Sequence, residues 1–324
     1  MLKDILKYAS RTPFANKFRR KLDSLNTRAN ILNKELGTWK KGFVPPGHYY
    51  STIPDLGQVR LQHSKLFDKS IELIPGIDLN TSQQLKFLEI IKSHYPEMPF
   101  PENPEKGYRY YFNNDFYAYS DGICLYSMLR HLRPRRFIEV GSGFSSAAAL
   151  DTRDRFLDPA THFTFIEPYP ERLNQLLTEA DKNNKNLNII SSFVQNISYN
   201  TFTSLDSSDI LFIDSTHVSR IGSDVNYLVF EILPRLNPGV YIHIHDIFFP
   251  FEYPAAWIYD ERFWNECYIL RAFLQFNNSF EIIYFNSYID ENFHNLIGDG
   301  MPLFLKRPAN NLTIPGSIWL RKIR

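Results

Sequence analysis

One stretch, Arg136–Leu150, constrains the fold of this chain more than any other. It begins with the apolar run Phe137–Val140, which is typical of a buried parallel strand. Gly141 and Gly143 follow, and they allow a tight turn and a close approach of a ligand to the backbone. Two serines then precede Ala147–Leu150, which predicts a helix N-terminus. A strand, a glycine turn and a helix in this order predict a nucleotide-binding corner, because free N–H groups of the helix point at the ligand.

The acidic residue Glu139, inside this strand, decides between two kinds of ligand. Its carboxylate would repel a pyrophosphate but attract a cationic sulfonium group. The third glycine of the dinucleotide fingerprint is also absent, and an α/β turn without any ligand is the remaining alternative. The corner resembles motif I of the class I S-adenosylmethionine-dependent methyltransferases. That resemblance implies a cofactor site at Glu139, Gly141, Ser142, Gly143, Phe144 and Ser145.

Strand and helix patterns alternate from Tyr108 onward, which predicts an α/β fold with helices on both faces of a mostly parallel sheet. After the first strand, four more are expected at Phe163–Glu167, Leu187–Ser191, Asp209–Asp214 and Val240–Asp246. Phe280–Phe285 and Pro302–Lys306 resemble the closing antiparallel pair of methyltransferase sheets. We therefore expect a Rossmann-like, seven-stranded sheet. Glu261–Phe276 is expected to form a long helix before the closing pair.

The chain is expected to divide into three parts. A helical and loop extension occupies residues 1–105, the methyltransferase domain residues 106–307, and a C-terminal tail residues 308–324. Helical spacing in the first 37 residues and the proline-rich stretch before Tyr108 set the first boundary.

Composition limits the function classes. Hydrophobic residues make up 44% and charged residues 22%, as in globular proteins. Two cysteines, no apolar run of membrane-spanning length and no signal-peptide pattern predict a cytoplasmic protein. Eleven Lys/Arg and three Asp/Glu give residues 1–41 a net charge of +8, so the remainder carries −7. The acidic body makes nucleic-acid binding unexpected. The basic end is expected to contact an anionic membrane or a second subunit, as in a homo-oligomer, unless it covers its own domain.

Polar residues follow the predicted second and third strands, where ligands of open α/β sheets bind. The carboxylate of Glu167 is suited to accept both hydroxyls of a ribose, and Pro168 follows it. Gln195, after the third strand, is suited to the amino edge of an adenine. An exposed strand-end acid without a ligand is the alternative for Glu167.

The fourth and fifth strands end in a second group of polar residues. Asp214 and Asp246 can share a divalent cation, which would lower the pKa of a substrate hydroxyl. His217 would be a general base near neutral pH. His245 stands where a carboxylate would suit magnesium, so its imidazole favours manganese, iron or zinc as the metal. The alternative is a site without metal, in which a pair of histidines acts instead. A histidine that only completes the strand end is the other alternative for His245.

This group resembles the magnesium-dependent sugar O-methyltransferases of macrolide biosynthesis and, more distantly, the catechol O-methyltransferases. The resemblance implies Asp214 and Asp246 as ligands of Mg²⁺ or another divalent metal, with His245 in the position of the third ligand. It implies His217 as the base, so that His217, Asp214 and His245 form the candidate catalytic set. Asp214, at the strand end, also lies beside the cofactor.

Aromatic residues are concentrated in three segments, Tyr110–Phe112, Tyr117–Tyr119 and Phe248–Trp257. They are suited to stack on a sugar or aromatic acceptor and to exclude water, and core packing is the alternative for about half of them. We therefore predict an S-adenosylmethionine-dependent O-methyltransferase of a sugar, glycan or secondary metabolite. A docking protein that keeps the fold without turnover, an N-methyltransferase and a related metal-dependent hydroxylase are the alternatives.

Overall fold

The computed structural model describes residues 21, 23–34, 43–298, 300–308 and 314–324. The chain divides into two units, Met1–His63 and Ser64–Arg324. In the first unit, residues 23–34 are helical, and a short helix α3 spans Leu56–Leu61. Most of the basic segment 1–41 lies outside the described residues. Helix α4 (His63–Leu66) spans the division between the units.

The predicted division at residues 105 and 106 differs from this one. Helix α5 (Thr81–His94) packs against a strand of the sheet and against helix α6 (Tyr119–Leu132). Phe87, Leu88 and Ile91 of α5 are buried in these contacts. The segment from residue 64 to 105 is therefore part of the sheet unit.

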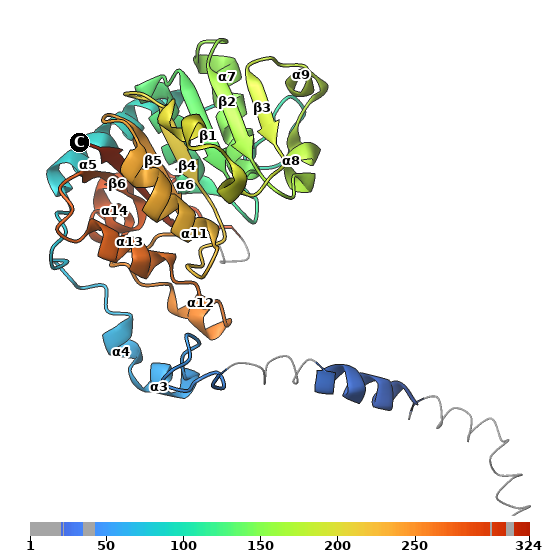
Figure 1. The fold of residues 1–324 in the computed structure, drawn as a ribbon. Helices are drawn as coiled ribbons and strands as arrows, with labels where there is room; N and C mark the ends of the chain where they lie inside the picture. Colours follow the sequence, from blue (N-terminus) through green and yellow to red (C-terminus); the bar gives the residue numbers. More distant parts are fainter. Residues whose placement is uncertain (1–20, 22, 35–42, 299, 309–313) are drawn as a thin grey trace, which may run out of the picture. The chain divides into compact units, whose positions relative to one another are not determined.

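A single seven-stranded sheet forms the centre of the second unit, in the order β3-β2-β1-β4-β5-β7-β6 (Figure 1). Strands β1 to β5 are parallel, and β7 is antiparallel to both of its neighbours. The predicted Rossmann-like, mostly parallel sheet is confirmed. The strands are β1 (Arg136–Val140), β2 (His162–Ile166), β3 (Leu187–Ile190), β4 (Ile210–Ile213), β5 (Tyr241–His245), β6 (Phe280–Phe285) and β7 (Ser317–Lys322).

Helices connect the strands and cover the sheet (Figure 1). From β1 the chain adds β2 and β3 on one side, and then returns to add β4 and β5 on the other. Because parallel crossovers are right-handed, these two series of connections lie on opposite faces. The other labelled α-helices are α7 (Phe144–Phe156), α8 (Glu171–Leu176), α9 (Glu179–Lys182), α10 (Tyr199–Thr203), α11 (Asp224–Tyr227), α12 (Ala255–Tyr259), α13 (Glu266–Leu274), α14 (Asn286–Asn292) and α15 (His294–Gly298).

Two predicted elements are corrected. The seventh strand is Ser317–Lys322 and not Pro302–Lys306, so residues assigned to a C-terminal tail form an inner strand of the sheet. Its three central residues, 318–320, are fully buried between β5 and β6. Helix α13 begins at Glu266 rather than Glu261, because Glu261 has a left-handed φ of 64° in the preceding turn.

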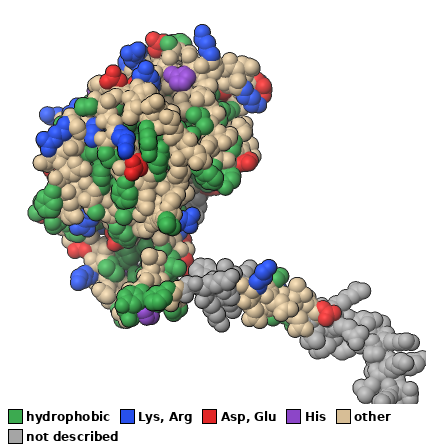
Figure 2. All heavy atoms as spheres, in the orientation of Figure 1, with side chains coloured by type: hydrophobic (Ala, Val, Ile, Leu, Met, Phe, Trp, Pro, Cys, Tyr) green, Lys and Arg blue, Asp and Glu red, His purple; other side chains and the backbone are tan. Residues whose placement is uncertain are grey.

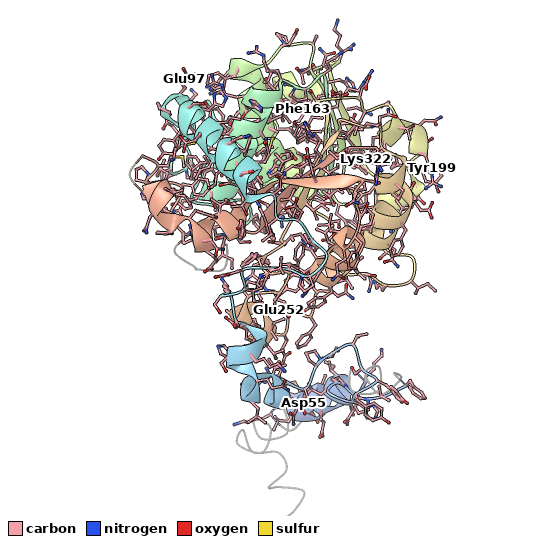
Figure 3. The ribbon with its side chains drawn as sticks, turned by 90° about the vertical axis from the view of Figure 1, so that its left-hand side faces the viewer. Asp55, Glu97, Phe163, Tyr199, Glu252 and Lys322 are labelled. Carbon is pink, nitrogen blue, oxygen red and sulfur yellow. The ribbon has the colours of Figure 1, made fainter. Side chains whose placement is uncertain are left out.

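Side chains fill the space between the sheet and the helices (Figure 3). Phe163 of β2 is fully buried there, whereas Glu97 and Tyr199 are exposed. Hydrophobic, charged and other side chains are all present on the face of the second unit seen in Figure 2. Both cysteines, Cys124 and Cys267, are buried and free. Among the helices in the described ranges, none combines the length and the hydrophobicity needed to cross a membrane.

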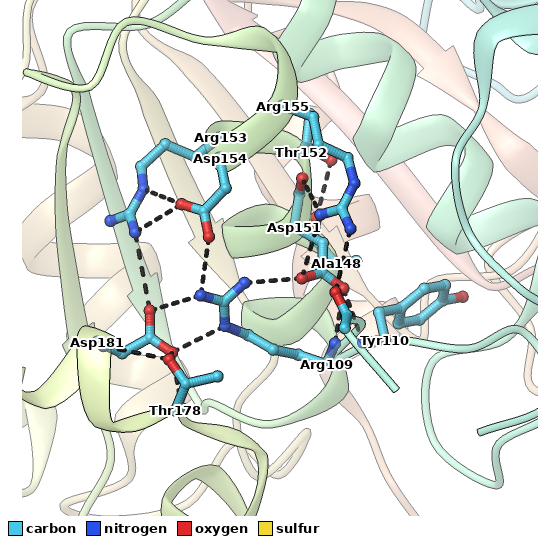
Figure 4. Close-up of polar contacts among 11 residues, drawn as sticks. Arg109, Tyr110, Ala148, Asp151, Thr152, Arg153, Asp154, Arg155, Thr178 and Asp181 are labelled. Carbon is cyan, nitrogen blue, oxygen red and sulfur yellow. Dashed lines mark hydrogen bonds and ion pairs between the residues drawn. The ribbon is translucent and has the colours of Figure 1, made fainter. Parts of the chain in front are cut away.

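An ion-pair network around Arg109 joins the segment before α6 to helices α7 and α9 (Figure 4). The guanidinium contacts carboxylate oxygens of Asp151, Asp154 and Asp181 at 2.7, 2.8 and 2.7 Å. Only 9% of the Arg109 side chain is exposed. Because its three partners belong to α7 and α9, the network holds the segment before α6 against both helices.

Candidate functional site

The turn between β1 and α7 depends on Gly141. Its φ is 81°, and an added Cβ would lie 1.7 Å from the carbonyl oxygen of Asp214. The Asp214 N–H donates to the Val140 carbonyl at 2.8 Å, which fixes the end of β4 against this turn. Gly143, in contrast, has an extended φ of −178°, and its Cβ would meet only the flexible Arg172 side chain at 3.2 Å. Gly141 is therefore the glycine that the fold requires.

Glu139 supports this corner from inside. Its carboxylate is fully buried and accepts hydrogen bonds from the Ser145 hydroxyl, at 2.6 Å, and from the Ser146 hydroxyl. Ser146 in turn accepts from the Gly143 N–H at 3.0 Å, so the helix N-cap is Gly143 and not the predicted serine pair. Burial raises the pKa of Glu139 to about 8, although the two serines act in the opposite direction. Glu139 therefore anchors the turn and does not line the cavities beside it, contrary to the expected contact with a sulfonium ligand.

Two cavities open at the carboxyl ends of the strands. The β3-side cavity, about 830 Å³, lies over the ends of β2, β3 and β4. The aromatic cavity, about 640 Å³, lies over the ends of β1, β4 and β5, and residues 142–145 of the corner line it. Both cavities share Gly141, Glu167 and Asp214, so one ligand at this edge can extend from one cavity into the other.

The predicted residues Glu167, Pro168 and Gln195 all line the β3-side cavity. The Glu167 carboxylate accepts hydrogen bonds from the N–H groups of Ser142, at 3.1 Å, and Tyr169, at 2.8 Å. Each of its oxygens keeps a lone pair for a ligand. Gln195 donates to the Gly222 carbonyl at 2.9 Å, while its Oε1 is buried without a hydrogen-bond partner in the described part of the chain. A buried acceptor in that state favours a ligand that supplies an N–H donor.

A histidine and three carboxylates meet at the ends of β4 and β5. The His217 Nε2 lies 3.4 Å from Asp214 Oδ1 and 3.4 Å from Asp246 Oδ2. On the other side of the ring, Nδ1 lies 2.9 Å from Oε2 of the buried Glu266. The ligand atoms of Asp214, His217 and Asp246 lie within 4.8 Å of one another, close enough to bind one metal ion. Glu266 would hold the His217 ring for that role, as second carboxylates often do beside metal-binding histidines.

Backbone strain and electrostatics also mark this cluster. His217 and Asp246 both have left-handed φ values, of 60° and 53°, which are uncommon for residues other than glycine. Burial alone would lower the pKa of His217, but hydrogen bonds to Asp214 and Glu266 and the charge of Asp246 raise it well above its usual value. Burial raises the pKa of Asp246, and the neighbouring carboxylate of Asp214 adds to that increase.

The two strand histidines have different surroundings. His245, 4% exposed, lines the aromatic cavity, and its Nε2 lies 3.6 Å from Asp246 Oδ1. It lies outside the group of three possible ligands, in which His217 stands instead. His243 is fully buried and stacked on Phe212, with ring centroids 3.9 Å apart. Burial lowers its pKa well below the usual value, so His243 belongs to the core and is not a candidate base.

The aromatic segments contribute less to the cavity than the sequence suggested. Tyr117 and Trp257 line the aromatic cavity, whereas the others are mainly core. The buried core members are Tyr110, Phe112, Tyr119, Phe248, Phe249, Phe251 and Tyr253. Sequence reasoning missed Trp264, whose ring centroid lies 4.5 Å from that of His217. It also missed Arg172 and Arg262, which line the same cavity, and Glu266. The high density of aromatic and acidic residues in the segment 257–266 was the feature of the sequence that could have indicated them.

Comparisons with known proteins agree with the fold. Residues 138–247 match the family described as a methyltransferase domain. An uncharacterized protein of Archaeoglobus fulgidus is 35% identical over 182 residues, which cover 55% of this chain and 79% of that protein.

Solved structures of low sequence identity also align. The O-methyltransferase TomG from Streptomyces achromogenes, in complex with S-adenosylmethionine, is 13% identical with a TM-score of 0.41; the alignment covers 82% of this chain and 96% of that one. An O-methyltransferase from Bacillus cereus, in complex with S-adenosylhomocysteine, is 12% identical with a TM-score of 0.40, over 82% and 97% of the two chains.

Proposed function

The chain belongs to the class I S-adenosylmethionine-dependent methyltransferases, and on that premise we propose that it methylates a hydroxyl group of a sugar, glycan or secondary metabolite. One observation carries the proposal. Asp214 belongs at once to the two cavities and to the cluster with His217 and Asp246. A cofactor in the β3-side cavity and an acceptor oxygen at the cluster would therefore meet beside Asp214.

The residues at the corner fit the cofactor. Glu167 would accept hydrogen bonds from the ribose hydroxyls, and the buried, unpartnered Oε1 of Gln195 would accept one from the adenine amino group. Residues 141–145 would face the amino-acid part, where Gly141 leaves the backbone accessible. The bound cofactor supplies an electrophilic methyl group, and the protein contributes mainly alignment, because an in-line displacement needs little else besides deprotonation.

Asp214, His217 and Asp246 would hold a divalent metal, whose chemistry there is to lower the pKa of the acceptor hydroxyl. Two oxygens and an imidazole nitrogen suit Mn²⁺, Fe²⁺ or Zn²⁺ better than Mg²⁺, which prefers oxygen ligands alone. Because the Nε2 of His217 faces both carboxylates, we assign it to ligation. The acceptor proton then goes to His245, which lines the same cavity beside Asp246.

A second arrangement keeps His217 as the base, without metal. It is favoured by the 2.9 Å contact between His217 Nδ1 and Glu266, since a carboxylate in that position orients an imidazole for proton transfer. The two arrangements differ in a measurable way. In the first, His217→Ala abolishes metal binding and His245→Ala does not. In the second, no metal binds, and only His217→Ala lowers turnover by the 10²–10⁴-fold typical of a positioned base.

Cofactor binding is tested by calorimetry with S-adenosylhomocysteine. Glu167→Ala should weaken binding about 10–100-fold, because a charged bidentate contact contributes about 1.5–3 kcal/mol. Glu179→Ala, an exposed acid on α9 that pairs with Lys182, is the matched control and should not change the affinity for S-adenosylhomocysteine. Wild-type protein that does not bind S-adenosylhomocysteine would contradict the proposal. Equal affinity of Glu167→Ala and wild type would remove the ribose assignment alone.

Metal binding is tested by titration with Mn²⁺, followed by the loss of the free-ion signal in electron paramagnetic resonance. Asp246→Asn should abolish binding, whereas Asp260→Asn, an exposed acid beyond α12, should not. Equal Mn²⁺ binding by both variants would place the metal elsewhere. If wild type binds no Mn²⁺, and direct calorimetric titrations show no binding of Zn²⁺ or Mg²⁺ either, the arrangement without metal remains.

A further inference from the structure

The Arg262 guanidinium lines the aromatic cavity and has no ionic partner among the residues that the structure describes. The Cζ of Arg262 lies 4.8 Å from the Trp257 ring centroid and 6.0 Å from that of Trp264. Within the described ranges of the chain, no carboxylate or carbonyl oxygen accepts a hydrogen bond from this guanidinium. Arg109 shows the contrast, since it contacts three carboxylates. Stacked on aromatic rings, Arg262 keeps the edge of its donor fork free for a ligand.

The chain builds this position with a defined turn. After α12, the Glu261 N–H donates to the Ile258 carbonyl at 3.1 Å, and the Arg262 N–H donates to the Trp257 carbonyl at 2.9 Å. The left-handed φ of Glu261, 64°, brings the chain back over Trp257, which is itself 5% exposed. Arg262 is therefore placed by hydrogen bonds and by a buried indole, and is not a freely moving surface side chain.

Trp264 connects this arginine with the reactive cluster. Its ring contacts the His217 ring at 4.5 Å on one side and reaches the Arg262 guanidinium at 6.0 Å on another. Trp257 packs edge-on against Trp264, with ring centroids 5.3 Å apart. A molecule the size of one sugar or aromatic ring can therefore lie along these indoles with one end at His217 and the other at Arg262.

An anionic acceptor in this cavity would need a cation beside it. Glu167, Asp214 and Asp246 line the same cavity, and they would repel an anionic ligand that had no counter-charge. A second arginine, Arg172, lies above the Phe116 ring at 3.6 Å and beside Gly143. That position is at the corner where the amino-acid part of the cofactor is proposed, so we assign Arg172 to the cofactor carboxylate. Arg262 remains for the acceptor.

We propose that the methyl acceptor is a ring compound carrying an oxyanion, a carboxylate or a phosphate, which Arg262 binds through its paired N–H donors. The ring packs against Trp264 and Trp257, and the hydroxyl to be methylated lies at the cluster of Asp214, His217 and Asp246. This proposal rests on the proposed function and specifies the acceptor for the same site. A neutral acceptor of the same shape binds more weakly, because it leaves the guanidinium unsatisfied.

The test measures binding of matched probes to the full chain saturated with S-adenosylhomocysteine, by ligand-observed nuclear magnetic resonance. One set is glucuronate, glucose 6-phosphate and glucose, and the other is benzoate, phenyl phosphate and benzyl alcohol. In at least one set, wild type should bind an anion about 10–100-fold more tightly than the neutral member, the range expected of a charge-assisted bidentate contact. The carboxylate and phosphate arms show which oxyanion is recognised.

Variants separate this role from others. Arg262→Gln should remove the preference for the anion, Arg262→Lys should keep only part of it, and Arg271→Gln, on α13 outside the cavity, should keep all of it. All three should bind S-adenosylhomocysteine as wild type does. No preference for an anion in wild type, or the same preference in Arg262→Gln, overturns the proposal. Loss of S-adenosylhomocysteine binding in Arg262→Gln alone also overturns it, because Arg262 would then bind the cofactor. Failure of wild type to bind S-adenosylhomocysteine instead refutes the proposed function.

Discussion

Replacing Gly141 by alanine should unfold the corner on which the site depends. The φ of 81° lies in the left-handed region, which costs an alanine about 1–2 kcal/mol. The new Cβ would also lie 1.7 Å from the Asp214 carbonyl oxygen, a backbone atom that no rotamer change can move away. Shifting packed backbone to relieve such an overlap costs about 1–3 kcal/mol. Together these effects predict a loss of about 2–5 kcal/mol in the free energy of unfolding.

Gly143→Ala is the matched control, because the same atom is added two residues away. Gly143 has an extended φ, and its Cβ would meet only Arg172 Cδ at 3.2 Å, which a flexible side chain can relieve. We expect a loss below about 1 kcal/mol. Urea unfolding followed by circular dichroism measures both variants, and calorimetry measures S-adenosylhomocysteine binding. Gly141→Ala should lose binding, and Gly143→Ala should keep most of it. Equal stability losses in the two variants would refute the reasoning.

Three further predictions follow from other parts of the chain. The pKa of Glu139 is about 8 in the folded protein and near 4.5 when the group is exposed, so between these pH values the folded protein binds a proton that the unfolded protein lacks. The free energy of unfolding should therefore fall by up to about 1.4 kcal/mol per pH unit as the pH rises from 4.5 to 8. Urea titrations at several pH values should show a flatter profile for Glu139→Gln. Arg109→Gln removes the shortest ion pairs of the buried carboxylates Asp151 and Asp181 and should cost about 3–5 kcal/mol in the same assay, and a loss below about 1 kcal/mol would contradict that. We also propose that the basic segment 1–41 contacts an anionic surface. The full chain should then sediment with phosphatidylserine vesicles at low salt but not at high salt. A molecular size that increases with protein concentration, without binding to the vesicles, would indicate a second subunit instead.

The sequence predicted the central part of the fold well, because the parallel strands are buried on both faces. Such strands are continuous apolar runs, and β1 to β5 were each located within one or two residues of their ends. The last strand was misplaced because two segments of similar length compete for it. Pro302 has no N–H for a ladder, whereas residues 318–320 form an apolar run suited to an inner position. The proline therefore favours Ser317–Lys322 over Pro302–Lys306 as the inner strand.

The site was only partly predictable, and the reason is geometric. Residues at strand ends converge because parallel strands end at one edge, so Glu167, Asp214 and Asp246 could be named from the pattern alone. Glu266 and Arg262 reach the site from α13 and from the turn after α12. Nothing in their spacing relates them to a strand end. The direction of the His217 ring also depends on Glu266, so its assignment as a base could not be distinguished from ligation.

The position of Asp214 follows from the strand order itself. The order reverses between β1 and β4, and in open α/β sheets ligands bind at such a reversal. Gly141 follows β1 and Asp214 follows β4, so the backbone of one must pack against the backbone of the other. The carbonyl of Asp214 is thereby fixed to the cofactor corner, while its carboxylate faces His217 in the neighbouring cluster. A single residue thus connects the proposed sites of the methyl donor and of the acceptor hydroxyl at one strand end.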